Sequence, residues 1–210
     1  MIIDLSVAIS NGMTVFSGHP EVVIKKYVSG TGSTIESLSL GSHSGTHIDT
    51  PAHFLPDAGT TSQLKLERLI SETYILNFSS INSSIKIGKK ELEKYSDFIK
   101  PGNSVFLNTG FNHSKSSETF NSDFPVLSID GAEYLVKNKI SVIGTESPSI
   151  GASTIEGISV HKLLLENDII IIEGLVNLKH VNNQPVKTIA LPLNLNSCSG
   201  APCRVIALED

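Results

Sequence analysis

Short segments with β-branched or alternating patterns recur along the whole chain, and they limit the folds that it can adopt. Nine such segments are bounded by Gly, Pro, Asn or Asp, which is typical of strands. They span residues 2–7, 22–28, 35–40, 74–78, 105–108, 140–143, 169–172, 188–191 and 204–208. Strands this short and this numerous predict that sheet dominates the fold.

Three segments have a helical pattern. Residues 89–98 carry apolar side chains at spacings of three. Residues 130–138 open with Asp130 and have a glutamate three residues later, which is a capping-box pattern. Residues 159–167 open with Ser159 as the expected N-cap. The last two helices each run into a strand, so we expect a mixed α/β fold with few helices and a partly parallel sheet.

Composition narrows the classes of function. No linker, repeat or long low-complexity stretch divides the chain, so we expect one domain over residues 1–210. The net charge of −5 and the scattered basic residues argue against a nucleic-acid partner and against a membrane partner. The N-terminus has no signal-peptide pattern, and Cys198 and Cys203 are expected to be free thiols, so a cytoplasmic location is predicted.

The most informative stretch for chemistry reads His-Ser-Gly-Thr-His-Ile-Asp-Thr-Pro-Ala-His. Its candidate ligands His43, His47, Asp49 and His53 all have odd numbers, which places them on one face of an extended chain. A straight strand would separate the first two by about 13 Å, whereas each imidazole must lie about 2.1 Å from a shared metal. We therefore expect the chain to tighten at Gly45 through a positive φ or a bulge.

Carboxylates strengthen the prediction of a metal site. At a spacing of two residues, about 6.6 Å on a strand, His47 and Asp49 can chelate one ion. Glu173 directly follows the apolar run 169–172, where an unpaired buried charge would be costly and a metal would compensate it. Imidazole and carboxylate without thiolate suit Zn, Mn, Fe or Co. The alternative, surface histidines in a polar loop, fits poorly because apolar residues alternate with these ligands.

The pattern His-x-Gly-Thr-His-x-Asp-x-Pro-x-His, from His43 to His53, resembles the signature of the cyclase family, which includes bacterial kynurenine formamidases and isatin hydrolases. Further markers resemble that family along nearly the whole chain. They lie at residues 4–6, 12–13, 18, 20, 109–110, 147–150, 161, 173–175, 191–193 and 200–202. The resemblance implies a swivelling β/β/α-type fold and a homodimer or homotetramer.

The resemblance also implies roles for individual residues. The implied metal ligands are His43, His47 and Asp49, with His161 and Glu173 completing a second metal position. One or two divalent ions per chain follow from this, with Zn²⁺ favoured and Mn²⁺ as the alternative. His53 matches the catalytic histidine of the family. The residues alone would instead suggest that His161 is a solvated helix-start residue.

The implied activity is that of an amidohydrolase that uses metal-activated water on a small molecule. The favoured reaction converts N-formylkynurenine to kynurenine and formate, and the alternative is hydrolysis of another amide, lactam or lactone such as isatin. A non-catalytic metal-binding protein is an alternative of another class, but it would have no use for His53. The Gly-x-Ser-x-Gly motif of serine hydrolases is absent from the sequence.

One segment departs from the family pattern. Ser17 and His19 stand where the family usually has Pro and Asp, in a segment expected near the substrate. The candidate substrate contacts are Phe16, His19 and Phe111. The two phenylalanines fit an aryl-binding pocket, and they fit ordinary core positions equally well.

Overall fold

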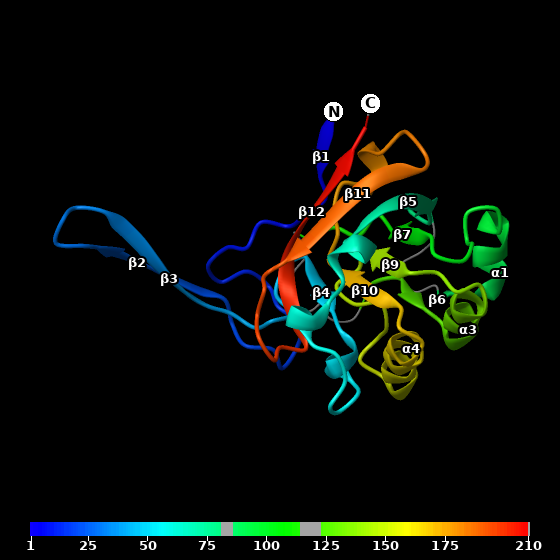
Figure 1. Ribbon diagram of the computed structural model, residues 1–210, viewed down its shortest axis with the longest axis horizontal. Coiled ribbons are helices and arrows are strands. Elements are labelled where there is room, and N and C mark those ends of the chain that lie inside the picture. Colours follow the sequence, from blue (N-terminus) through cyan, green and yellow to red (C-terminus); the bar gives the residue numbers. More distant parts are fainter. Residues whose placement is uncertain (81–85, 114–122, 210) are drawn as a thin grey trace.

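The computed structural model describes residues 1–80, 86–113 and 123–209 (Figure 1). Its main sheet has eight strands in the order β1-β12-β11-β5-β7-β9-β10-β4, and it closes on itself because β4 also pairs with β12. These strands are β1 (Ile2–Asp4), β4 (His47–Asp49), β5 (Ile70–Asn77), β7 (Ser104–Asn108), β9 (Val142–Thr145), β10 (Ile170–Glu173), β11 (Val186–Pro192) and β12 (Gly200–Leu208).

Helices cover one face of the parallel part of this sheet, which consists of β5, β7, β9 and β10 (Figure 1). They are α1 (Lys89–Leu92), α3 (Ile129–Lys137) and α4 (Ile155–Glu166). The remaining pairings of the main sheet are antiparallel. The predicted mixed α/β fold with few helices and a partly parallel sheet is therefore confirmed.

Side-chain alternation divides the interior into two cores. On β10, Ile170 and Ile172 point into the core enclosed by the sheet, whereas Ile171 packs toward the helices. On β4, Ile48 points into the enclosed core, so its two neighbours point the other way. By the same parity Glu173 points to the helix side, beside α4. The alternation thus brings the polar residues of both strands to one outer face.

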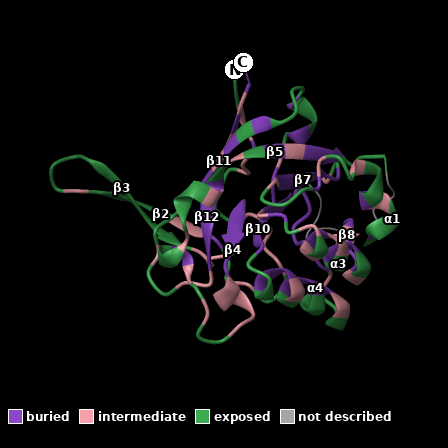
Figure 2. Cartoon of the chain, turned by 45° about the vertical axis from the view of Figure 1, so that its right-hand side comes forward, coloured by how far each residue is buried: buried purple, intermediate pink, exposed green. Residues whose placement is uncertain are grey.

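Smaller elements surround the sheet. The hairpin of β2 (Val23–Val28) and β3 (Thr34–Ser39) projects from the body and is mostly exposed (Figures 1 and 2). β6 (Lys86–Ile87) pairs in parallel with β8 (Val126–Leu127). The 3₁₀ helices are η1 (Pro51–His53), η2 (Thr61–Gln63), η3 (Leu66–Leu69), η4 (Glu93–Tyr95) and η5 (Leu178–His180). No helix among the described residues is long and apolar enough to cross a membrane.

All nine predicted strands have counterparts, but the predicted helix starts are wrong. The N-cap of α3 is Ser128, whose side chain accepts a hydrogen bond from Gly131 N, so Asp130 lies inside the first turn. The N-cap of α4 is Thr154, five residues before the predicted cap Ser159, whose hydroxyl donates to Ile155 O within the helix. The predicted helix 89–98 is split into α1 and η4, and the two- and three-residue strands β4, β6 and β8 were too short to predict.

Candidate metal centre

The geometry of β4 and β10 brings three candidate ligands together. His47 lies opposite Glu173 in the antiparallel register, and Asp49 is the next outward-facing residue of β4. Gly45 has a φ of +65°, which confirms the tightening predicted before His47. Gly174 has a φ of +69°, and a Cβ there would lie 2.7 Å from Gly45 O. These two glycines therefore allow the two chain segments to approach closely.

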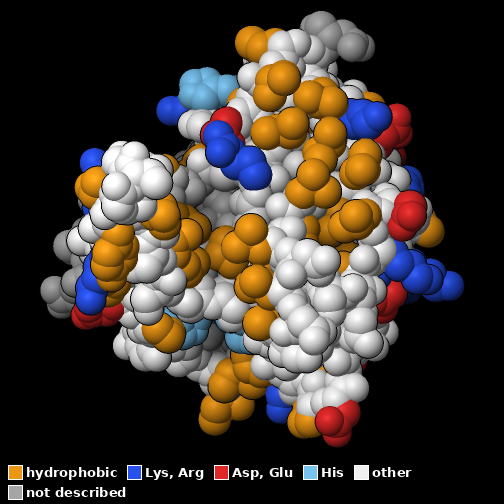
Figure 3. All heavy atoms as spheres, turned by 60° about the vertical axis from the view of Figure 1, so that its left-hand side comes forward, with side chains coloured by type: hydrophobic (Ala, Val, Ile, Leu, Met, Phe, Trp, Pro, Cys, Tyr) orange, Lys and Arg blue, Asp and Glu red, His pale blue; other side chains and the backbone are white. Residues whose placement is uncertain are grey.

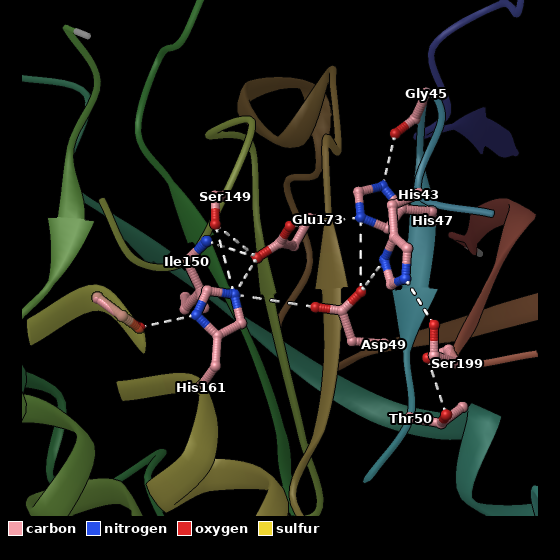
Figure 4. A network of polar contacts seen from close by, with 11 residues as sticks. His43, Gly45, His47, Asp49, Thr50, Ser149, Ile150, His161, Glu173 and Ser199 are labelled. Carbon is pink, nitrogen blue, oxygen red and sulfur yellow. Dashed lines mark hydrogen bonds and ion pairs between the residues drawn. The ribbon is translucent and has the colours of Figure 1, made fainter. Parts of the chain in front are cut away.

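His43 and His161 complete the cluster from two other segments (Figure 4). His43 lies in the turn before β4, with its Nδ1 2.7 Å from Asp49 Oδ1. His161 lies in the middle of α4 and is buried, with its Nε2 3.1 Å from Glu173 Oε1. The interpretation of His161 as a solvated helix-start residue is wrong, because α4 begins at Ile155 and turns this side chain toward the sheet.

Two carboxylates link the three imidazoles. Asp49 is fully buried and Glu173 is 4% exposed. His47 Nε2 lies 3.5 Å from Asp49 Oδ1 and 3.3 Å from Glu173 Oε2. Glu173 Oε1 also accepts hydrogen bonds from Ser149 Oγ at 3.1 Å and from Ile150 N at 2.7 Å, which fix this carboxylate (Figure 4).

The charges of the cluster stabilise one another. Burial disfavours the charged imidazoles, but hydrogen bonds to Glu173 and attraction to the carboxylates outweigh it and raise the pKa of His47 and of His161 to about 9. Burial also opposes ionisation of the acids. The hydrogen bonds from His161 and His47 nevertheless hold the pKa of Glu173 well below its usual range, and the contact with His43 lowers the pKa of Asp49.

The donor set fits a divalent metal ion. The Nδ1–H of His47 donates to Gly45 O at 2.9 Å, and the Nδ1–H of His161 donates to Gly157 O at 2.8 Å, so both Nε2 atoms face the carboxylates. Metal-bound histidines generally have such a partner on the second nitrogen. Asp49 Oδ2 is buried and accepts no hydrogen bond from any described residue, so a cation would compensate it.

Binding of a metal is expected to release protons. At pH 7, with no metal, His47 and His161 are protonated because their pKa is about 9, whereas a metal requires the neutral imidazoles. The apparent affinity for Zn²⁺ should therefore rise by about tenfold per pH unit for each proton released, and level off above pH 9. Calorimetric titration in buffers of different ionisation enthalpy measures the number of protons. Zinc binding without proton release at pH 7 would contradict this charge state.

His53 lies beside the cluster, at the end of η1. Its ring centroid is 4.0 Å from that of His43. Burial lowers the pKa of His53 to about 4, against the attraction of Asp49, so the imidazole is neutral at pH 7. Ligand atoms of His43, Asp49 and His53 lie within 4.8 Å of one another, as do those of His47, Asp49 and Glu173. The geometry therefore accommodates His53 either as a proton carrier or as a ligand.

A cavity of about 630 Å³ opens onto these residues. Histidine side chains are visible in a recess of the surface (Figure 3). Phe16 and His19 lie on the cavity wall, and the ring of His19 is 6.0 Å from that of His43. Phe111 does not line the cavity and packs against His113 and Phe124 instead.

Several residues around this cavity have no distinguishing pattern in the sequence. His113 lines it, with its Nε2 2.9 Å from Glu146 O, and Phe124 packs edge-on against Phe16. His113 stands alone between polar residues and therefore carried no spacing signal. Ser149 lies in the stretch 147–150, which resembles a family marker but has no residue type or spacing that indicates a role.

A buried cluster of three histidines and two carboxylates beside an open cavity defines a metal-dependent hydrolase. The Cyclase family model matches residues 3–152, and the chain therefore belongs to the cyclase family. Over 97% of its length it is 33% identical to a kynurenine formamidase of Bacillus anthracis, covering 95% of that protein.

Solved structures support the same assignment. A protein described as a potential metal-dependent hydrolase with cyclase activity is 28% identical, with a TM-score of 0.83 and coverage of 100% of this chain and 99% of the other. An isatin hydrolase bound to the product analogue thioisatinate has a TM-score of 0.89 at 23% identity, and the match covers 99% of this chain and 92% of the other. The second likeness shows that the fold is shared.

Proposed function

We propose that this chain is an amidohydrolase that cleaves N-formylkynurenine to kynurenine and formate. The observation that carries the proposal is the convergence of five candidate ligands, from four separate segments, beside a neutral histidine and a cavity. The kynurenine formamidase of B. anthracis, 33% identical over nearly the whole chain, supports this choice of substrate.

The candidate ligands divide into two groups. His43, His47 and Asp49 would hold one divalent ion, and His161 and Glu173 would complete a second position. When bound, such an ion activates water and polarises the substrate carbonyl. Zinc is favoured by the imidazole-rich donors, and manganese is the alternative. Asp49 and Glu173 offset the positive charge, and Ser149 and Ile150 hold Glu173 in place.

His53 is assigned to proton transfer. Its neutral imidazole accepts a proton from the attacking water and passes it to the leaving nitrogen of the amide. The aromatic ring of Phe16 packs along the aryl group of the substrate and excludes water from this side of the cavity. Both residues line the cavity, so both are within reach of a molecule bound there.

An activity panel tests the proposed reaction. Enzyme loaded with zinc or with manganese is assayed with N-formylkynurenine, isatin and simple aryl formamides. The proposal expects the highest kcat/KM for N-formylkynurenine.

The second candidate function is hydrolysis of a lactam such as isatin. It is favoured by Ser17 and His19, which replace the usual Pro and Asp of the family in a segment of the cavity wall expected near the substrate. Turnover of isatin alone would establish that alternative, and no turnover by metal-loaded enzyme would refute both.

We also propose a homodimer or homotetramer. The β2–β3 hairpin exposes Tyr27 (52%), Ile35 (55%), Leu38 (64%) and Val28 (69%). A two-stranded hairpin is at best marginally stable alone in water, so cover from a second copy would stabilise it. Light scattering at micromolar concentration should give at least twice the chain mass of 22.5 kDa, and Leu38→Lys should lower it. A wild-type monomer would contradict the assembly, while leaving the catalytic proposal intact.

A reducing compartment such as the cytoplasm is proposed for this chain. Cys198 and Cys203 are both free thiols. Burial raises the pKa of Cys203 to about 12, with a further contribution from Asp49, so this thiol stays protonated and unreactive.

A further inference from the structure

The three histidines of the metal centre are not held in the same way. His47 and His161 each belong to a regular element and donate Nδ1–H to a backbone carbonyl. His43 lies in a turn, and its Nδ1 faces Asp49 Oδ1 at 2.7 Å. Its other nitrogen, Nε2, lies 3.1 Å from Ser199 Oγ, which is the hydroxyl of a residue 156 positions later. The orientation of His43 therefore depends on a side chain from a distant segment (Figure 4).

The segment that carries this hydroxyl is itself fixed to β4. Ser199 O accepts hydrogen bonds from Thr50 N at 3.0 Å and from Thr50 Oγ1 at 2.8 Å. The next residue, Gly200, pairs with Asp49 in the register of β12 and β4. The start of β12 is thus held in position relative to one carboxylate of the centre.

Gly200 also provides the space for the imidazole of His43. A Cβ at this position would lie 2.5 Å from His43 Cε1 and 2.9 Å from His43 Nδ1. Real Cβ atoms do not approach other atoms this closely, so a side chain here would displace the ring. Ser199 therefore contacts the imidazole of His43 through a hydrogen bond, and Gly200 leaves the space that the ring occupies.

We propose that Ser199 is a positioning residue that stabilises the Nε2–H tautomer of His43 in the metal-bound centre. Without a metal, Nδ1–H would donate to Asp49 Oδ1; with a metal beside Asp49, the Ser199 hydroxyl would accept a hydrogen bond from Nε2–H and leave the lone pair of Nδ1 for the ion. His43 would then bind the metal through Nδ1, whereas His47 and His161 would bind it through Nε2. This inference rests on the proposed metal-dependent function and adds to it the atom by which each histidine binds.

Substitution of Ser199 tests whether it positions His43, and the quantity measured is metal affinity rather than activity. Partners of this kind typically contribute 10- to 100-fold to metal affinity, so Ser199→Ala should weaken zinc binding by about that factor. Ser199→Thr keeps the hydroxyl and should restore most of the affinity. The matched control is Ser71→Ala, since Ser71 is also half-buried and hydrogen-bonded, at 2.7 Å to Ser104 Oγ, but lies on β5 with Thr73 and Ser104 as its partners. This control should bind zinc like the wild type.

The tautomer is measured directly on the zinc-loaded wild-type protein. Long-range ¹H–¹⁵N spectra of the imidazoles should show His43 protonated at Nε2, and His47 and His161 protonated at Nδ1. Protonation of His43 at Nδ1 overturns the inference, as does wild-type zinc affinity in Ser199→Ala. If that variant does not fold, the wild-type spectrum still decides. A wild-type chain that binds no zinc would overturn the metal centre and this inference together. If the wild type binds zinc and Ser199→Ala binds it equally tightly, this inference alone is overturned.

Discussion

Asparagine in place of Asp49 is expected to remove the metal and the hydrolytic activity together. Asp49 Oδ1 faces both His43 and His47, and Oδ2 lies 3.9 Å from His161 Nε2, so this one carboxylate borders every imidazole of the proposed centre. Asn keeps the size of the side chain but removes its charge. Affinity for zinc should fall by more than the roughly 100-fold that outer partners contribute.

Turnover should fall with the metal. A loss of about 10⁴-fold corresponds to about 5.5 kcal/mol of transition-state stabilisation, which is the scale expected when metal-activated water is lost. Metal content by elemental analysis and kcat/KM are measured on the same preparation. Asp57→Asn makes the same chemical change in an exposed turn and should alter neither quantity. Full activity of Asp49→Asn without metal would refute the metal-dependent mechanism.

A different pattern is expected for His53. His53→Ala should keep most of its metal and fold normally, because His53 is proposed to carry protons and not to bind the ion. Its turnover should fall by about 10²- to 10⁴-fold, the usual contribution of a general acid–base group. His53→Asn is similar in size and polarity but does not titrate, so it should be nearly as impaired.

The paired measurement separates the two roles that the geometry accommodates. His180→Ala is the control, since His180 is an exposed histidine at the end of η5. If His53→Ala loses metal in step with activity, His53 is a ligand, as its proximity to His43 and Asp49 accommodates. If it keeps both metal and wild-type turnover, proton transfer belongs to another group, and His19 on the cavity wall is the next residue to replace.

Much of the candidate site was predictable from local sequence because its ligands follow the period of a strand. The spacing of His47 and Asp49 places both on one face, and the structure has them on β4. Glu173 was predictable for a thermodynamic reason, as a charge at the end of an apolar strand requires compensation. The tight backbone conformation at Gly45 was predictable from distance, because a straight strand would hold the imidazoles of His43 and His47 too far apart to share one metal.

The remaining parts depend on contacts between distant segments, which have no local pattern. His161 gave no signal by itself because the start of α4 was predicted four residues too late, which left its direction unknown. Ser199 reaches His43 only through the register between β12 and β4. The closure of the sheet was also unpredictable, since it depends on a strand of three residues.

The double pairing of β4 bears on the order in which a newly made chain becomes active. Residues 43–49 leave the ribosome early, but β4 pairs with Ile171–Glu173 of β10 and with Gly200–Pro202 of β12, which are synthesised more than a hundred residues later. Closing such long loops costs conformational entropy, and only the contacts of β4 with β10 and β12 offset that cost. The histidines of the signature therefore cannot assemble with Glu173 and Ser199 until most of the chain has been synthesised. Nascent chains should acquire their metal only after the segment from residue 199 onward has emerged.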